Sequence, residues 1–116
     1  MNTPAPFEVT SEAQEVVASL LRQHPEMQAA LILIPSFEEL DEQGAVGARF
    51  EREHFMMAFD SPDKFLRWPH VELCGQRVPV SPDALERLDG RTLAIQAHDI
   101  NYNAGGKETR EFLVAA

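Results

Sequence analysis

The fold of this chain is decided by residues 71–95, which read VELCGQRVPVSPDALERLDGRTLAI. Apolar and polar residues alternate on both sides of Gly75-Gln76, a tight reversal, so this part predicts a two-stranded hairpin. Ser81 is a suitable N-cap, Pro82 fits the first helical position, and Gly90 can end the helix in a left-handed conformation. A further strand is predicted over residues 93–97. The pattern of hairpin, short helix and strand indicates an α+β domain.

The region before this stretch predicts an arm, a helix and a buried strand. Residues 1–6 contain two prolines and should form a loose N-terminal arm that leads into a short strand at residues 7–9. Ser11 and Gln14 make a capping box, and apolar residues at helical spacing predict an amphipathic helix over residues 11–22. The apolar run at residues 29–34 lies between Pro25 and Pro35, which favours a buried central strand.

Residues 35–47 are predicted to form an exposed loop, because they combine two glycines with four acidic side chains. One interpretation is a solvated acidic surface that aids solubility, and the other is a docking face for a basic partner. The candidate partner-binding residues are Glu38, Glu39, Asp41 and Glu42.

Residues 48–59 are predicted to form a long strand whose alternation of polar and apolar residues slips along its length. A bulge near His54 would explain the slip, and so would burial of the second half on both faces. The second half of this predicted strand contains an apolar cluster, which is interpreted as core rather than as a cofactor site. It consists of Phe55, Met56, Met57 and Phe59. The connector at residues 61–69 should be held to the core by Phe65, Leu66 and Trp68. A turn at residues 101–107 and a strand at residues 108–114 complete the expected elements.

Composition limits the classes of function. A chain of 116 residues can bury a core as a single domain spanning residues 1–116. The formal net charge of -9 argues against nucleic acid as a partner, because affinity for phosphates comes from Lys and Arg. The apolar run at residues 29–34 is far shorter than the ~20 residues of a membrane span. Cys74 is the single cysteine, which excludes an intramolecular disulfide and favours a cytoplasmic location.

The order of these elements resembles the HesB or IscA-type family of iron–sulfur cluster carriers. Like that family, the chain has an early helix, a buried strand, a long loop, a strand and a hairpin with a central glycine. A short helix ending in Leu88-Asp89-Gly90 and two final strands follow. The resemblance implies a mixed, mostly antiparallel sheet folded on itself as a pseudobarrel, with an N-terminal helix and a short second helix outside it.

The cluster ligands of that family are absent from this sequence. The family uses one cysteine in a Gly-Cys-Ser-Gly loop and two in a Cys-Gly-Cys segment, and neither motif occurs here. Thiolates hold iron–sulfur clusters, and acidic residues in a hydrated loop do not replace them. Cys74 lies in the predicted hairpin and is interpreted as structural. We therefore expect a non-enzymatic, divergent member of the family, without a cofactor, that acts through contacts with a protein partner.

A metal- or small-ligand-binding role is the alternative hypothesis. Four histidines are present, and the strongest candidate pair is His98 with Asp99, although neighbours on a strand point to opposite faces. Ser36, Ser61 and Ser81 lie beside prolines in turns, without a nucleophile elbow, and Gly105-Gly106 is interpreted as a hairpin turn. A homodimer formed through the sheet edge is a further hypothesis.

Overall fold

The structure, a computed structural model, describes residues 4–116 and confirms an α+β fold. The elements, in chain order, are β1 (Glu8–Val9), α1 (Ser11–Leu21), β2 (Gln28–Ile34), β3 (Phe37–Leu40), β4 (Val46–Phe50), β5 (His54–Asp60), a 3₁₀ helix (Pro62–Phe65), β6 (His70–Leu73), β7 (Gln76–Pro79), α2 (Pro82–Leu88), β8 (Thr92–Asn101) and β9 (Lys107–Ala115). The N-terminal helix, the short second helix and the mostly antiparallel pairing are as predicted. No helix in the described part of the chain has the length and apolar composition needed to cross a bilayer.

The first three residues of the predicted N-terminal arm lie outside the described residues, and its second half touches the body of the domain. Pro4 bridges Glu72 of β6, and the carbonyl of Pro6 accepts a hydrogen bond from the backbone N–H of Gly90 at 3.0 Å. Ala5 packs against the main hydrophobic core.

The N-cap of helix α1 lies one residue earlier than predicted. Thr10, rather than Ser11, is the N-cap, because its Oγ1 accepts the backbone N–H of Ala13 at 3.1 Å and its backbone is extended. The expected box of Ser11 and Gln14 is therefore wrong in register, and Ser11 lies exposed in the first turn. Ala13 and Val17 are the fully buried positions of the helix.

The change Thr10→Ala is expected to lower the free energy of unfolding by about 1 kcal/mol, since one backbone donor loses its acceptor. Ser11→Ala is the matched control and should change it by less than about 0.5 kcal/mol. Urea denaturation of the two variants measures both values. A larger loss in the free energy of unfolding for Ser11→Ala than for Thr10→Ala would indicate that Ser11 is the N-cap, as expected from the sequence.

Five strands form the main sheet in the order β1-β8-β9-β5-β2, with β1 parallel to β8 and the other neighbours antiparallel. Strand β2 is thus at the end of this sheet, so its prediction as a central strand is wrong. Its outer edge is nevertheless covered. Leu31 bridges Val80, and the carbonyl of Leu31 accepts the backbone N–H of Ser81 at 3.0 Å, which joins the β6–β7 hairpin to the sheet.

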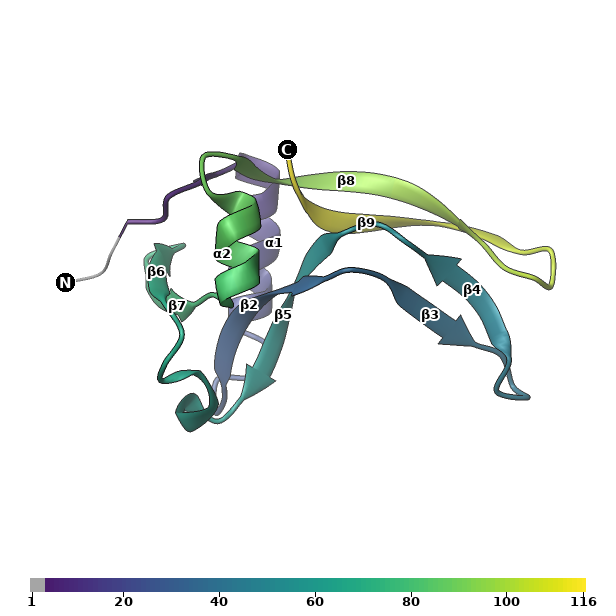
Figure 1. The fold of residues 1–116 in the computed structure, drawn as a ribbon, viewed down its shortest axis with the longest axis horizontal. Coiled ribbons are helices and arrows are strands. Elements are labelled where there is room, and N and C mark those ends of the chain that lie inside the picture. Colours follow the sequence, from purple (N-terminus) through teal and green to yellow (C-terminus); the bar gives the residue numbers. More distant parts are fainter. Residues whose placement is uncertain (1–3) are drawn as a thin grey trace.

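The region predicted as an exposed loop is largely a hairpin. Strand β3 pairs antiparallel with β4, with Phe37 opposite Phe50 and Glu39 opposite Ala48. Figure 1 shows β3 and β4 continuing outward from β2 and β5, while β8 and β9 run alongside to the same end of the molecule. The two tips are joined by a hydrogen bond of 2.7 Å from the backbone N–H of Asn103 to the carbonyl of Gly47.

The slip in alternation over residues 48–59 corresponds to a break between two strands. Strand β4 ends at Phe50, residues 51–53 are exposed, and β5 begins at His54. This interruption lies immediately before His54, where a bulge was expected. In the connector after β5, Phe65 is buried as predicted, but Leu66 is 70% exposed. Trp68 is partly buried and packs on Phe65, with ring centroids 4.8 Å apart.

The decisive stretch of sequence folds as predicted, with a change in its turn. Strands β6 and β7 are joined by Cys74-Gly75, which have φ angles of 51° and 75°, so the reversal is one residue earlier than expected. Positive φ at both central residues is the type I′ pattern that suits a two-residue hairpin. Ser81 occupies the N-cap position of α2, but its hydroxyl donates to Asp83 at 2.6 Å and makes no capping hydrogen bond to the backbone. Gly90 has a φ of 72° just after the helix. Strands β8 and β9 are longer than predicted and leave only residues 102–106 as their turn.

Two hydrophobic clusters hold these elements together. The main cluster joins α1 and α2 to β2, β5, β6, β7 and β8, with Leu31, Leu88 and Leu93 among its fully buried side chains. The second cluster lies between the β3–β4 hairpin and the outer half of β8–β9. Its buried members are Ala48, Phe50, Ile100 and Phe112. The outer hairpins are thus packed against each other around aromatic side chains.

Candidate functional site

An open apolar groove lies where α1, β5 and β9 meet. Its volume is about 580 Å³, within the range of roughly 300–1,000 Å³ that is usual for ligand sites. The wall from α1 includes Val16 and Leu20, and Ile95 of β8 also lines the groove. Met56 lines it from β5 and is 45% exposed, so an apolar side chain faces solvent there.

The groove follows strand edges rather than a sheet face. Successive side chains of a strand point to opposite faces, yet the consecutive residues 54–57 of β5 and 110–113 of β9 all line it. This lining is explained by the pairing of the two strands. Among the described residues, β5 and β9 are paired only at Phe55 and Leu113, although β5 pairs with β2 along its whole length. The two strands therefore diverge, and the groove occupies the opening between their facing edges.

Aromatic side chains of the second cluster form one end of the groove. The rings of Phe50 and Phe112 are stacked, with centroids 4.2 Å apart and planes 2° apart. Phe37 packs on both rings at 5.6 and 5.9 Å. His54, which is 6% exposed, meets Phe112 edge to face at 5.0 Å, and its Nδ1 lies 2.9 Å from the carbonyl oxygen of Arg52. This end of the groove is a closely packed cluster of rings.

Arg110 lines the groove and is held by two carboxylates. Its Nη1 donates to Glu39 at 2.6 Å, and its Nη2 donates to Glu108 at 2.9 Å. The guanidinium also lies over the ring of Phe37, 5.6 Å from its centroid. These two carboxylates, Glu108 first, raise the pKa of Arg110 above its ordinary value. Arg110 therefore joins β9 to β3 as a permanent cation.

Tyr102 completes this polar network. Its hydroxyl oxygen lies 2.6 Å from Oε2 of Glu108 and 2.8 Å from Oε2 of Glu39, so its one proton is shared between two acceptors. The pKa of Glu39 is lowered by the hydrogen bonds from Arg110 and then Tyr102, and the pKa of Glu108 by those from Tyr102 and then Arg110. The same two carboxylates, Glu108 first, raise the pKa of Tyr102 to about 12.

The chain has one tyrosine, so its titration can be followed directly by the absorbance of the tyrosinate. In the folded protein we expect half-ionisation near pH 12, and in denaturant near pH 10. Because the folded pKa is raised, the stability that the network contributes is fully present below about pH 10 and is lost as the pH rises through about 12. Glu108→Gln should move the folded titration toward the denatured one. A folded midpoint near pH 10 would contradict the network.

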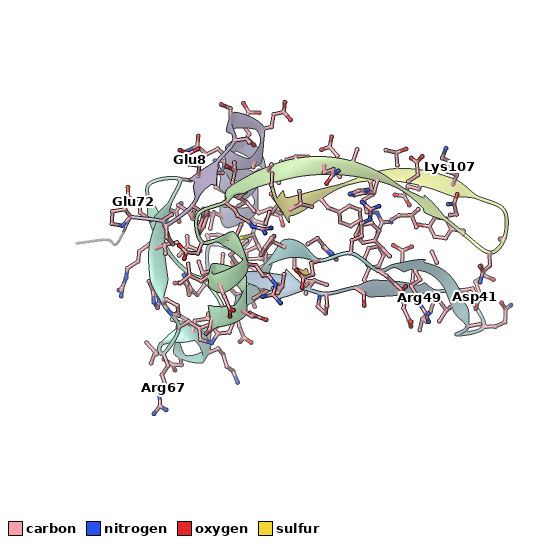
Figure 2. The ribbon with its side chains drawn as sticks, turned by 45° about the horizontal axis from the view of Figure 1, so that its top comes forward. Glu8, Asp41, Arg49, Arg67, Glu72 and Lys107 are labelled. Atoms are coloured by element: carbon pink, nitrogen blue, oxygen red, sulfur yellow. The ribbon has the colours of Figure 1, made fainter. Side chains whose placement is uncertain are left out.

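The four acidic side chains predicted to bind a partner have different contacts in the structure. Glu38 pairs with Arg49 at 2.6 Å on the neighbouring strand, and Glu39 pairs with Arg110. Asp41 accepts the backbone N–H groups of Gln43 and Ala45 with Oδ1, both at 2.9 Å, and so shapes the turn. Glu42 is exposed in that turn. Figure 2 shows Asp41 at the far end of the hairpin, away from the helices.

The alternative site residues, His98 and Asp99, point to opposite faces of β8. His98 packs on Phe50, with ring centroids 5.4 Å apart. Asp99 accepts a hydrogen bond from Thr109 at 2.7 Å and pairs with Lys107 at 3.1 Å. Thr109 and then Lys107 lower the pKa of Asp99. The structure therefore gives the two side chains separate neighbours.

Two of the four histidines, His54 and His98, pack on the same stacked rings of Phe50 and Phe112, while the other two and Cys74 lie elsewhere. His24 lies against Phe59, and His70 Nδ1 lies 2.8 Å from the carbonyl oxygen of Trp68. Within residues 4–116, no group of three or more His, Cys, Asp or Glu side chains is arranged to hold a metal ion. Cys74 is partly buried at the hairpin turn, its Sγ lies 3.5 Å from the carbonyl oxygen of Gln14, and burial raises the pKa of its thiol.

The groove itself was not predicted from the sequence. Phe55 and Met57 are buried, as expected of core residues, but Met56 is exposed in the groove and Phe59 is only partly buried. The sequence shows only an apolar run here, with no local signal that distinguishes Met56 and Phe59 from the buried residues. Comparison with protein-family models, with curated proteins and with solved structures finds no match to the chain.

Proposed function

We propose that this chain is a non-enzymatic binding domain with a HesB-like fold that lacks cluster-ligating cysteines and acts through a protein partner. The observation that carries this proposal is the open apolar groove, in which Met56 is 45% exposed. A concave apolar surface that stays open to water is a common place for a ligand or partner to bind. The partner covers Met56 and its neighbours when it binds.

The charged residues beside the groove fit binding better than chemistry. Arg110 is engaged by Glu39 and Glu108 at 2.6 and 2.9 Å, so its donors are directed at the protein's own carboxylates. Glu39, predicted from the sequence as a partner-binding residue, thereby lies next to the groove. The proposed contact surface therefore combines an apolar groove with the acidic side chains of β3.

The order of elements supports the HesB-like part of the proposal. Helix α1, strand β2, strand β5, hairpin β6–β7, helix α2 and hairpin β8–β9 occur in the order that the resemblance implies, with the β3–β4 hairpin in place of its long loop. In the described residues the main sheet has two ends, β1 and β2, and a bridge from Leu31 to Val80 links its β2 end to the β6–β7 hairpin. The pseudobarrel and a cytoplasmic location are parts of the same proposal.

Affinity enrichment with matched variants tests the binding function. The full chain, Met56→Lys and Leu66→Lys are immobilised and exposed to extract from the source cells. Leu66 is a suitable control, because it is 70% exposed and does not line the groove. We expect one protein to be recovered by the wild type and by Leu66→Lys but not by Met56→Lys. Equal recovery by all three, or recovery of none, would count against the proposal.

Anaerobic reconstitution with iron and sulfide tests the absence of a cluster. Because Cys74 is the chain's only cysteine, it can supply at most one thiolate per chain. We therefore expect the desalted protein to hold far less than one iron and one acid-labile sulfide per chain. A stable visible chromophore at stoichiometric iron and sulfide would refute this part of the proposal.

A further inference from the structure

We propose that the groove accepts an extended peptide segment of the partner, which adds as a strand along the free edge of β5. The segment carries apolar residues at alternate positions and a lysine or arginine beside them. This inference rests on the proposed function and names the chemistry of its partner.

The backbone of β5 offers the edge that such a strand needs. On one side, all seven residues of β5 pair with β2, from His54 opposite Ile34 to Asp60 opposite Gln28. On the other side, the described pairing with β9 consists of Phe55 and Leu113 alone. Beyond Phe55, every second residue within 56–60 therefore directs its backbone donor and acceptor to a side on which the described part of the chain pairs no strand. A free edge of this kind is the surface on which strand addition takes place.

The walls of the groove determine the side-chain pattern of the segment. Val16 and Leu20 line the groove from α1, which packs beside β5. Successive side chains of an added strand point to opposite faces, so every second one would lie against this apolar wall. Met56 lies in the same groove and can adapt to the side chains that enter, because its thioether chain is unbranched and flexible.

The charge of the groove selects a basic segment. Glu111 lines the groove, is exposed and belongs to none of the ion pairs among the described residues. Arg110 contributes one positive charge, which Glu39 and Glu108 more than balance. Glu39 and Glu108 lie outside the lining and engage that guanidinium, so Glu111 is the charge of the lining that has no ion-pair partner among the described residues. A lysine or arginine of the segment complements this charge and sets the direction of the strand.

A random dodecapeptide library displayed on phage, selected on the full chain, supplies the probe. We expect enriched peptides with apolar residues at every second position and at least one lysine or arginine. Binding of the synthetic peptides should fall at least about tenfold for Met56→Lys and for Glu111→Lys, and should be unchanged for Leu66→Lys. N-methylation of the peptide backbone should weaken binding about tenfold at alternate residues, because strand addition uses every second amide.

Three results with the peptides would overturn the inference. They are the absence of an enriched peptide family, equal binding to Met56→Lys and the wild type, and tolerance of N-methylation at every peptide position. A dimer of the chain in sedimentation that Met56→Lys dissociates would place a second copy in the groove and would also overturn it. If the affinity enrichment succeeds with the same variants while the peptides fail, the proposed function stands and only strand addition is lost.

Discussion

Replacing Phe112 with alanine is expected to lower the free energy of unfolding by about 3–5 kcal/mol. The ring of Phe112 is stacked on Phe50 at 4.2 Å and also contacts His54 and Phe37. Its removal would leave a cavity between the β3–β4 hairpin and β9, where the second cluster is small and has few other side chains to fill the space. Urea denaturation followed by circular dichroism measures the loss.

Phe112→Leu is the control for this prediction, because it keeps most of the apolar volume and removes only the stacking. Its loss should be clearly smaller than that of Phe112→Ala. Hydrogen exchange of the β3 and β4 amides gives a second measurement, since those strands should open first in Phe112→Ala. A loss below about 1 kcal/mol for Phe112→Ala would show that the outer hairpins are not held together by this ring.

Replacing Leu31 with alanine is expected to lower the free energy of unfolding by about 2–5 kcal/mol. Leu31 is 0% exposed, and its strand joins the main sheet to Val80 and Ser81. The matched control is Leu66→Ala, where the same atoms are removed from a side chain that is 70% exposed. That variant should change the free energy by less than about 0.5 kcal/mol. Similar losses for the two variants would contradict the assignment of Leu31 to the main core.

Elements with local signals were predictable from the sequence. Helix α2 is an example, because its N-cap, its proline and the glycine that follows it are all within ten residues of one another: Ser81, Pro82 and Gly90. The β6–β7 hairpin is another, although its turn was displaced by one residue. Cys74 has a positive φ, and a cysteine is an uncommon residue in that conformation, so the sequence favoured Gly75-Gln76 instead.

The β3–β4 hairpin was missed because its stabilising contacts are distant in the sequence. Glu39 was predicted to lie in an exposed loop, either solvated or binding a partner, but Arg110 and Tyr102 bind it from positions 71 and 63 residues away. Phe37 likewise packs on Phe112 of β9. Local composition, with four acids and two glycines, gives no information about such partners. Residues 35–47 were therefore predicted to form a loop.

The groove could not be predicted for a similar reason. The groove exists because β5 and β9 pair at Phe55 and Leu113 and then diverge. That divergence depends on the tertiary arrangement of strands that are distant in the sequence. The sequence of β5 alone shows only an apolar run, and burial of that run was the natural expectation. By contrast, strand alternation correctly placed His98 and Asp99 on opposite faces.

Amide spectra of the isotope-labelled full chain, recorded while an enriched dodecapeptide is added, test the central claim most directly. If the opening between β5 and β9 is the binding site, the largest shifts and new protection from hydrogen exchange should occur at residues 56–60 and 110–113. Amides of the β6–β7 hairpin and of the Asp41 turn should remain unchanged. Shifts confined to that turn, or protection gained anywhere other than along the facing edges of β5 and β9, would contradict it.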